Sequence, residues 1–501
     1  MQRTFLTNLG LILVLNLLVK PFYILGIDAG VQEAVGATAY GGYAALLSLG
    51  FLLNIVLDLG ITNYNTRHIA QHTHLMGKYF SGVVGVRFVL AGLYALLSLG
   101  VGLLLGYSGT QMSMLGWLVL NQILAATILY FRSNIAGAQH LRTDSLLSVM
   151  DRLLLIGMVG WALWGRVGGS PFRIEWFVWA QTVSYGVTAV VALVLVLRLS
   201  GKVLPKWNPT FGRVVLRQSF PYAMLILLMT FYYRTDTLML ERMLPEGAFE
   251  AGVYYQGFRF FEAFNMIGYL FAGLLLPIFS RMLSSKAGSG PGGRDGLDPL
   301  VGMAFKLVLA GSLAIAVIGS MHATQVMELL YNSNTNRAGT VFALLIWSFV
   351  GVCTTYIFGT LLTAGGNLRT LNWLAGIGAV VNICLNAILI PRYQAEGAAW
   401  ASLVTQLATA VAQMILATRM YNLRMPFPVL GRAIGYGLAL AGLAWVLQWT
   451  GTTFFTSLAF FALGALGLAS VTRMLDLRAI RTLVAEKYEA PEGEQVVDRP
   501  D

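Results

Sequence analysis

Apolar runs of about twenty residues alternate with short polar connections along almost the whole chain. A hydrocarbon core of about 30 Å is crossed by about 20 helical residues, so each run can span a membrane once. Lipid offers no hydrogen-bond partner to free backbone groups, and the runs lack the alternation of barrel strands, so the pattern predicts helices. The fourteen predicted spans are 5–27, 39–62, 80–106, 112–131, 145–165, 174–197, 218–240, 251–280, 299–320, 339–363, 371–390, 395–418, 430–449 and 453–472.

Composition agrees with this pattern. Of the 501 residues, 57% are hydrophobic and 11% are charged, and the mean hydropathy is +0.70. Soluble domains are far more charged than this. The net charge of +11 comes from short basic clusters between apolar runs, which indicates contact with lipid headgroups rather than with nucleic acid. We therefore expect an all-α polytopic membrane protein.

The first run and the cysteines add two further expectations. Residues 5–27 are too long for a cleavable signal segment and contain Lys20 and Pro21, so this run is expected to be a retained helix. Cys353 and Cys384 both fall inside predicted spans, so a disulfide framework is not expected.

Basic residues in the connections predict the orientation. An even number of spans places both termini on the same side of the membrane. The connections on that side hold 22 cations, and those on the other side hold 5. Cytoplasmic connections of membrane proteins are enriched in Lys and Arg, so both termini are predicted to be cytoplasmic.

The longest connection before the tail, Ser200–Arg217, is basic and divides the first twelve spans six and six. Sliding the first half by 211 positions brings Tyr43 onto Tyr254 and Asn54 onto Asn265, which favours two related bundles. The predicted units are an N-terminal six-helix lobe at 1–200, a basic cytoplasmic linker at 201–217, a C-terminal six-helix lobe at 218–421, helices 13 and 14 at 422–474, and a cytoplasmic tail at 475–501.

Several predicted spans contain basic residues, and these are the main chemical signal. A cation at the bilayer centre costs about 2.5–3.5 kcal/mol on insertion scales, so a chain that keeps several is expected to build a wet, positive cavity for an anion. The candidates are Lys20, Arg87, Arg152 and Arg234. For the first three, the alternative is snorkelling to the headgroups, and for Arg234 it is an ion pair between the lobes with Asp58 or another acid.

Lys20 and Arg234 receive the most weight. Each lies about fifteen residues into its helix, roughly 22 Å along at 1.5 Å per residue, and the two helices are counterparts in the two lobes. Pro21 beside Lys20 predicts a kink in the first helix. Arg259 and Glu262 stand at i, i+3 on one helical face and are expected to neutralise each other.

The order of several short motifs resembles the bacterial oligosaccharide flippases of the MOP superfamily, the O-antigen repeat-unit type also called Wzx. The motifs are Leu57-Asp58-Leu59-Gly60 with Arg67, Tyr232-Tyr233-Arg234-Thr235-Asp236, Ala251-Gly252-Val253-Tyr254, Leu276-Pro277-Ile278, Ser280-Arg281-Met282, Asn382, Asn386, Ile390-Pro391 and Gly397-Ala398-Ala399. Each is weak alone, and their order over nearly the whole chain carries the resemblance. It implies two six-helix lobes around a V-shaped cavity that opens alternately to either side.

The resemblance also implies a function in the bacterial cytoplasmic membrane. The substrate would be an isoprenoid (undecaprenyl) pyrophosphate-linked oligosaccharide, moved to the outer leaflet for a cell-surface polysaccharide such as the O-antigen of lipopolysaccharide. The expected partners are this lipid-linked glycan, membrane lipids, a polysaccharide polymerase and glycosyltransferases. No cofactor is expected, and the acids within the spans leave the coupling ion open between H⁺ and Na⁺. The residues expected in structural or gating roles are Asp58, Arg67, Asp236, Arg259 and Glu262.

Two other classes of protein compete with this interpretation. A drug or cation exporter of the MATE branch would share the two-lobe fold, but fourteen helices and a cationic surplus favour the flippase. A membrane polymerase or ligase needs a sizeable outer loop with acids or histidines, whereas the longest outer connection, 321–340, holds only Glu328 and His322. No nucleotide-binding, paired-carboxylate or metal-helix motif occurs, so a transporter rather than an enzyme is expected. A passive lipid scramblase is a third interpretation.

Overall fold

The computed structural model describes residues 18–62, 65, 69, 76–138, 140–165, 171–200, 209–284, 294–424 and 427–475. Within these ranges every element is a helix, which confirms the predicted all-α class. Residues 5–17 of the first predicted span, Arg67, and the tail after 475 lie outside the described residues. The elements are η1 (Tyr23–Asp28), α2 (Ala29–Leu53), α3 (Ile55–Asp58), α5 (Met76–Leu104), α6 (Gly109–Gly137), α7 (Leu141–Trp164), α8 (Ile174–Ser200), α9 (Pro209–Met243), α10 (Gly247–Ser284), α11 (Arg294–Met321), α12 (Ala323–Glu328), α13 (Thr335–Ala364), α14 (Leu368–Tyr421), α15 (Phe427–Trp449) and α16 (Phe454–Val471).

The longest element, α14, is a hairpin of two helices. Gln394 interrupts it with φ 54°, outside the helical region. A Cβ on Gly397 would lie 2.3 Å from the carbonyl oxygen of Leu389, whereas residues eight apart in a straight helix are separated by about 12 Å. The chain therefore reverses at Gln394, between the spans predicted at 371–390 and 395–418.

The element α2 reverses in the same way at Gly36, which has φ 81°. Tyr40 donates a hydrogen bond of 2.9 Å to Asp28, although a straight helix would hold residues twelve apart at about 18 Å. Eleven of the described helices are long and apolar enough to span a membrane. Dividing the two hairpins at their turns and adding α9 gives fourteen spans in the described part of the chain, as predicted.

The first helix ends later than predicted. The sequence places its end at residue 27, whereas the structure continues it to Val35, and the stretch beginning two residues after Pro21 is the π-helical η1. A proline has no backbone N–H to donate and disturbs regular α-helical hydrogen bonding near it, so the predicted irregularity takes this form. Asp28 consequently lies inside a helix rather than in a connection.

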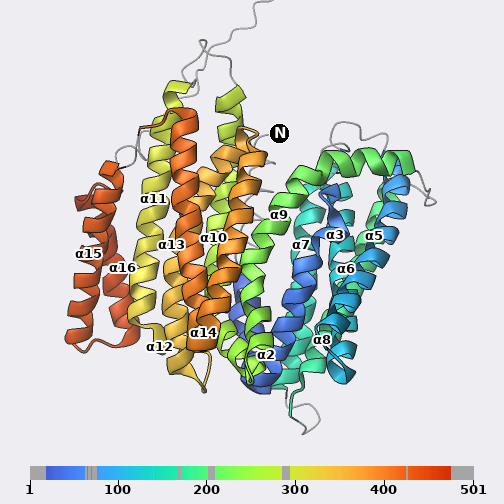
Figure 1. Cartoon of the computed structure of the whole chain (residues 1–501), viewed down its shortest axis with the longest axis horizontal. Coiled ribbons are helices and arrows are strands. Elements are labelled where there is room, and N and C mark those ends of the chain that lie inside the picture. Colours follow the sequence, from blue (N-terminus) through green and yellow to red (C-terminus); the bar gives the residue numbers. More distant parts are fainter. Residues whose placement is uncertain are drawn as a thin grey trace, which may run out of the picture.

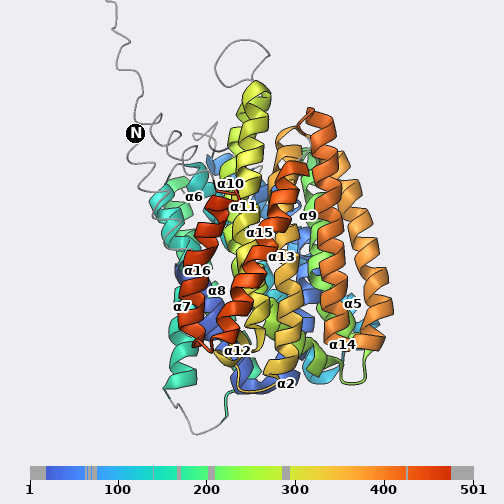
Figure 2. The same ribbon diagram turned by 90° about the vertical axis from the view of Figure 1, so that its left-hand side faces the viewer.

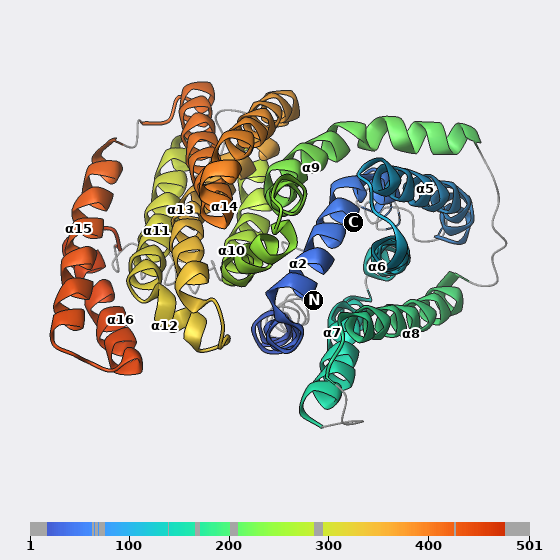
Figure 3. The ribbon, with the colours of Figure 1, turned by 60° about the horizontal axis from the view of Figure 1, so that its bottom comes forward.

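Helix α9 begins earlier than predicted. It starts at Pro209, so residues 209–217 of the predicted linker are helical. Proline suits this place because the first helical residue needs no backbone N–H donor and has the φ that proline fixes. The first part of α9 lies along the N-terminal half of the molecule, and its later part packs against α14 and α10 (Figures 1 and 3).

The helices form two six-helix lobes. The N-lobe comprises the first helix, the rest of α2 with α3, and α5 to α8; the C-lobe comprises α9, α10, α11, α13 and the two halves of α14. The hairpin α15–α16 packs on α11 at the edge of the C-lobe, outside both lobes (Figures 1 and 2). This arrangement confirms the predicted pair of lobes with two further C-terminal helices.

The two lobes meet through their backbones at one end, drawn at the bottom of Figure 1. A Cβ on Gly41 would lie 1.8 Å from the carbonyl oxygen of Ala248, and a Cβ on Gly252 would lie 2.0 Å from that of Ala37. The shift of 211 positions seen in the sequence brings Ala37 onto Ala248 and Gly41 onto Gly252, so the two sides of this crossing are counterparts. Only glycine allows two helices to approach so closely. We call this crossing, Ala37–Gly41 with Ala248–Gly252, the closed end.

Polar contacts between the lobes surround the closed end. The guanidinium of Arg242, in the last turn of α9, lies 3.6 Å from the ring centroid of Tyr107 and donates 2.7 Å to the carbonyl of Leu105. Tyr107 donates 3.0 Å to Glu241, and Gln32 of the first helix donates 2.8 Å to a backbone carbonyl of α10. These contacts hold the lobes together at this end.

Candidate functional site

A cavity of about 580 Å³ lies between the lobes. Its walls come from the first helix, α2, α6, α7 and α8 on one side and from α9, α10 and α13 on the other. Tyr269 lines the cavity and is 68% exposed, and it lies about 26 Å along α10 beyond Gly252 of the closed end at 1.5 Å per residue. The cavity therefore opens toward the end opposite the closed end.

The cavity is cationic. Among the described residues that line it, the only acid is Glu262. The basic side chains that line it are Lys20, Arg132, Arg152, Arg234 and Arg259. Both lobes contribute to this set, so an anion in the cavity would contact the two lobes at once.

Lys20 is the cavity cation that makes no hydrogen bond and no ion pair with any described residue. It lies beside Pro21, on the first helix just before η1. An ammonium placed inside a membrane protein without an acid is costly, which leaves its charge available to a ligand or to water. Lys20 was predicted to face the cavity, and the structure places it there.

Arg152 also lines the cavity, on α7. It donates a 2.9 Å hydrogen bond to the hydroxyl of Tyr185, and its guanidinium lies 4.7 Å from the ring centroid of Tyr23 and 5.7 Å from that of Tyr185. Its Nε lies 3.8 Å from Asp151, at the limit of an ion pair. The two aromatic faces fix the plane of the guanidinium, as cation–π contacts do.

Arg132 lines the same wall nearer the open side, a position that the sequence assigned to a connection. The structure extends α6 to Gly137, so Arg132 lies within the helix. It makes a bidentate pair with Asp144, at 2.7 Å and 3.2 Å. A fork–carboxylate pair of this kind neutralises much of the charge.

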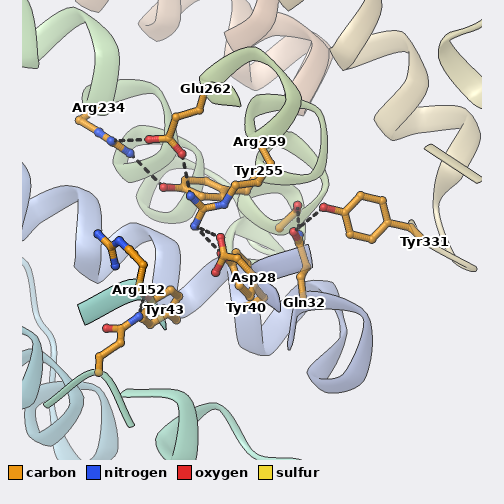
Figure 4. A network of polar contacts seen from close by, with 12 residues as sticks. Asp28, Gln32, Tyr40, Tyr43, Arg152, Arg234, Tyr255, Arg259, Glu262 and Tyr331 are labelled. Atoms are coloured by element: carbon orange, nitrogen blue, oxygen red, sulfur yellow. Dashed lines mark hydrogen bonds and ion pairs between the residues drawn. The ribbon is translucent and has the colours of Figure 1, made fainter. Parts of the chain in front are cut away.

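Arg234 lines the C-lobe wall, and it is not unpaired. Its Nη2 donates 2.8 Å to Glu262, and its Nη1 donates 3.0 Å to the hydroxyl of Tyr255 (Figure 4). Its guanidinium lies 4.5 Å from the ring centroid of Phe51, which belongs to the N-lobe. The predicted alternative of an ion pair holds in part, because the partner is Glu262 of the same lobe rather than Asp58.

Arg259 joins the two lobes. The predicted i, i+3 pair with Glu262 is present at 2.6 Å. The same guanidinium contacts the carboxylate of Asp28 and donates 2.6 Å to the hydroxyl of Tyr40, both in the N-lobe (Figure 4). Asp28 is completely buried and was missed in the sequence, because the predicted span stopped one residue before it. The signal that could have found it is the apolar and small-residue pattern that continues to Val35.

Arg87 does not line the cavity, although it lies near the start of its predicted span, as Arg152 does. It contacts Asp58 and donates 2.8 Å hydrogen bonds to the hydroxyl of Thr62 and to the carbonyl of Ala126. It thereby ties α5 to α3 and α6 inside the N-lobe. Its charge is met by Asp58, and the structure places Arg87 inside the N-lobe rather than on the cavity lining.

Asp236 lies inside the C-lobe, away from the cavity lining. It is 0% exposed and accepts hydrogen bonds from Tyr254 (2.8 Å), from Asn386 (2.7 Å) and from Ser402. No cation among the described residues lies within ion-pair distance of it. Neutral donors alone hold this carboxylate, and they join α9, α10 and both halves of α14.

Metal-binding clusters do not appear in the described ranges: no three His, Cys, Asp or Glu side chains gather in a way that could hold an ion. The arrangement can bind an anion by charge and by hydrogen bonds from both lobes.

Comparison with known structures supports the fold. The "Lipid II flippase MurJ, inward closed conformation" superposes with a TM-score of 0.69 at 14% identity, covering 92% of this chain and 97% of that one. A mutant of the Vibrio cholerae MATE transporter VcmN gives a TM-score of 0.57 at 16% identity, covering 84% and 97%. The inward-facing conformation of a multidrug resistance MATE family transporter of the MOP superfamily gives 0.56 at 13% identity, covering 82% and 94%.

Sequence comparison supplies the family. No curated protein sequence is similar enough to match the chain. A family model described as "Polysaccharide biosynthesis protein" matches residues 5–283, more than half of the 501 residues. Together with the fold, this match confirms the resemblance to MOP-type flippases that the sequence motifs indicated. The chain belongs to the polysaccharide biosynthesis protein family.

Proposed function

We propose that this protein moves an isoprenoid pyrophosphate-linked oligosaccharide from the inner to the outer leaflet of the bacterial cytoplasmic membrane. The observation that carries the proposal is the cavity between the lobes, with Lys20 and Arg152 on one wall and Arg234 and Arg259 on the other. A pyrophosphate offers several oxygens to several donors, and the planar fork of arginine suits phosphate oxygens. The family match and the MurJ-like fold support a lipid-linked substrate.

The charges in the connections orient the molecule. They support an orientation in which the open side of the cavity faces the cytoplasm and the closed end faces the outside, and in this orientation the structure corresponds to an inward-facing state. Glycosyltransferases would deliver the glycan on the cytoplasmic side, and a polymerase would take it on the outside for a surface polysaccharide such as O-antigen. Export requires the closed end to part while the other end closes.

A drug or cation exporter is less well supported, although it would share the fold. A cationic substrate would meet Lys20, Arg152 and the arginines of the C-lobe, with Glu262 as the only acid on the described lining. Like charges in a low-dielectric cavity repel strongly.

Substitution of the cavity cations tests the proposal. Lys20→Ala and Arg234→Ala, alone and together, should abolish export of the lipid-linked glycan in cells while protein abundance stays near wild type. Arg234→Lys should recover only part of the export, because a point charge lacks the bidentate fork. Lys306→Ala is the matched control, since Lys306 lies within α11 and does not line the cavity. Full export by the double alanine variant at normal abundance would refute the anion cavity.

A further inference from the structure

We propose that Glu262 is an internal anion that competes with the substrate's pyrophosphate for Arg234 and Arg259 and makes the site selective for pyrophosphate-linked over monophosphate-linked lipids. This inference rests on the proposed function and assigns a specificity-determining role to a residue of the same cavity.

The geometry of Glu262 is that of a bridging anion. Its Oε1 accepts 2.8 Å from Arg234, and its Oε2 accepts 2.6 Å from Arg259, so one carboxylate serves two guanidinium groups (Figure 4). The hydroxyl of Tyr255 accepts a hydrogen bond from Arg234, and the ring centroid of Tyr255 lies 4.5 Å from the Arg259 guanidinium. Tyr255 therefore contacts both arginines and holds them side by side. Glu262 is therefore the one carboxylate among the described residues that contacts both guanidinium groups, and Arg259 is paired in addition with Asp28.

Exposure shows which acid in this network can leave. The side chain of Asp28, the second acid on Arg259, is 0% exposed and lies at the interface of the lobes. The side chain of Glu262 is 23% exposed and lines the cavity. A carboxylate that moves into water keeps its solvation, whereas a carboxylate that loses its partner in a buried place does not. Glu262 is therefore the group that an incoming anion displaces.

Displacement of Glu262 sets a threshold on the charge of the ligand. Removing the carboxylate breaks two charge-assisted contacts at once, which are about twice as strong as neutral hydrogen bonds. A pyrophosphate diester carries two negative charges on two phosphorus centres, so it can serve both Arg234 and Arg259 and still face Lys20 across the cavity. A monophosphate diester carries one charge, which only equals the charge of the carboxylate that it must replace.

The test compares two synthetic short-chain lipids on the purified full-length protein in detergent. The probes are citronellyl pyrophosphoryl N-acetylglucosamine and citronellyl phosphoryl N-acetylglucosamine, which differ by one phosphate and one charge. Binding is measured by calorimetry for wild type, Glu262→Gln and Glu262→Asp. Asp144→Asn is the matched control, because Asp144 neutralises Arg132 on the cavity wall but touches neither Arg234 nor Arg259.

Wild type should prefer the pyrophosphate lipid by at least tenfold. Glu262→Gln should bind the monophosphate lipid at least tenfold more tightly than wild type and should narrow the preference. Glu262→Asp keeps the negative charge and should retain most of the preference for the pyrophosphate lipid. This variant still tests the role of the carboxylate if Glu262→Gln does not fold. Asp144→Asn should leave the preference unchanged.

Three results would overturn the inference. An unchanged preference in folded Glu262→Gln would show that the carboxylate does not compete with the ligand. An equal narrowing in Asp144→Asn would reduce the effect to the bulk charge of the cavity. Loss of the preference in Glu262→Asp would show a structural role for Glu262. The proposed function is tested separately by the pyrophosphate lipid. If wild type binds this lipid and Lys20→Ala binds it more weakly, the proposed function stands whatever the Glu262 variants show. If wild type does not bind it, both the proposed function and the role of Glu262 are overturned.

Discussion

The ion pair between Arg259 and Asp28 joins the lobes. The loss of folding stability on removing only one of the two partners can be calculated. Arg259→Ala leaves Asp28, which is 0% exposed, with only the hydroxyl of Tyr40 as a hydrogen-bond donor among the contacts described. Two unit charges at 4 Å interact by about 4 kcal/mol at an effective dielectric constant of 20, and breaking one side of a buried pair costs about 3–5 kcal/mol. We therefore expect Arg259→Ala to be strongly destabilised.

The pair can instead be removed as a whole. Asp28→Asn combined with Arg259→Leu eliminates both buried charges, and such replacements are often neutral for stability. The double variant should therefore recover most of the unfolding temperature that Arg259→Ala loses, measured by intrinsic fluorescence in detergent with retention on size-exclusion chromatography as the check of folding. A double variant no more stable than Arg259→Ala would refute the assignment of the cost to the orphaned carboxylate.

Three further predictions concern the closed end, the topology and the buried acid. Gly41→Ala should keep the lobes from closing, because its Cβ would fall 1.8 Å from a carbonyl oxygen. A thiol reagent added outside should then label a cysteine in the cavity faster than in wild type. Gly42→Ala is the control and should behave as wild type, because nothing lies within 4 Å of its Cβ. A cysteine at Ser200 should resist labelling from outside and one at the exposed Glu246 should react, and the reverse result would invert the topology. Asp236→Asn should raise the unfolding temperature, because it removes a buried charge with no described cation in contact, and a fall would indicate that a bound cation stabilises the carboxylate.

The helices were predictable because lipid imposes a strong rule on length and hydropathy. All fourteen spans occur in the described residues or partly within them, and the turns at Gly36 and Gln394 fall between predicted spans. The errors lie at helix ends, where small or polar residues extend a helix beyond its apolar part. Asp28 and Arg132 were left out of the candidate site for this reason, since both lie in helix that the hydropathy pattern assigned to connections.

The partners of the charges were less predictable than their existence. Arg87 and Arg152 each lie about two turns inside a predicted span. Arg87 nevertheless pairs with Asp58 inside the N-lobe, whereas Arg152 lines the cavity. The i, i+3 pair of Arg259 with Glu262 was predicted because helical spacing fixes it. Contacts between distant helices, such as Arg234 with Glu262 or Arg259 with Asp28, depend on how the lobes pack, and spacing along the chain carries no information about them.

The closed end also decides where the membrane voltage falls. Water and salt in the cavity carry the potential of the compartment on the open side, so most of the voltage drop lies across the thin contact of Gly41 and Gly252 with the opposite helix backbones. On the proposed topology an inside-negative potential pushes an anion outward through this layer, with about 2.3 kcal/mol per charge per 100 mV. A pyrophosphate-linked glycan would thus be drawn to the outer face by the voltage itself when the closed end parts.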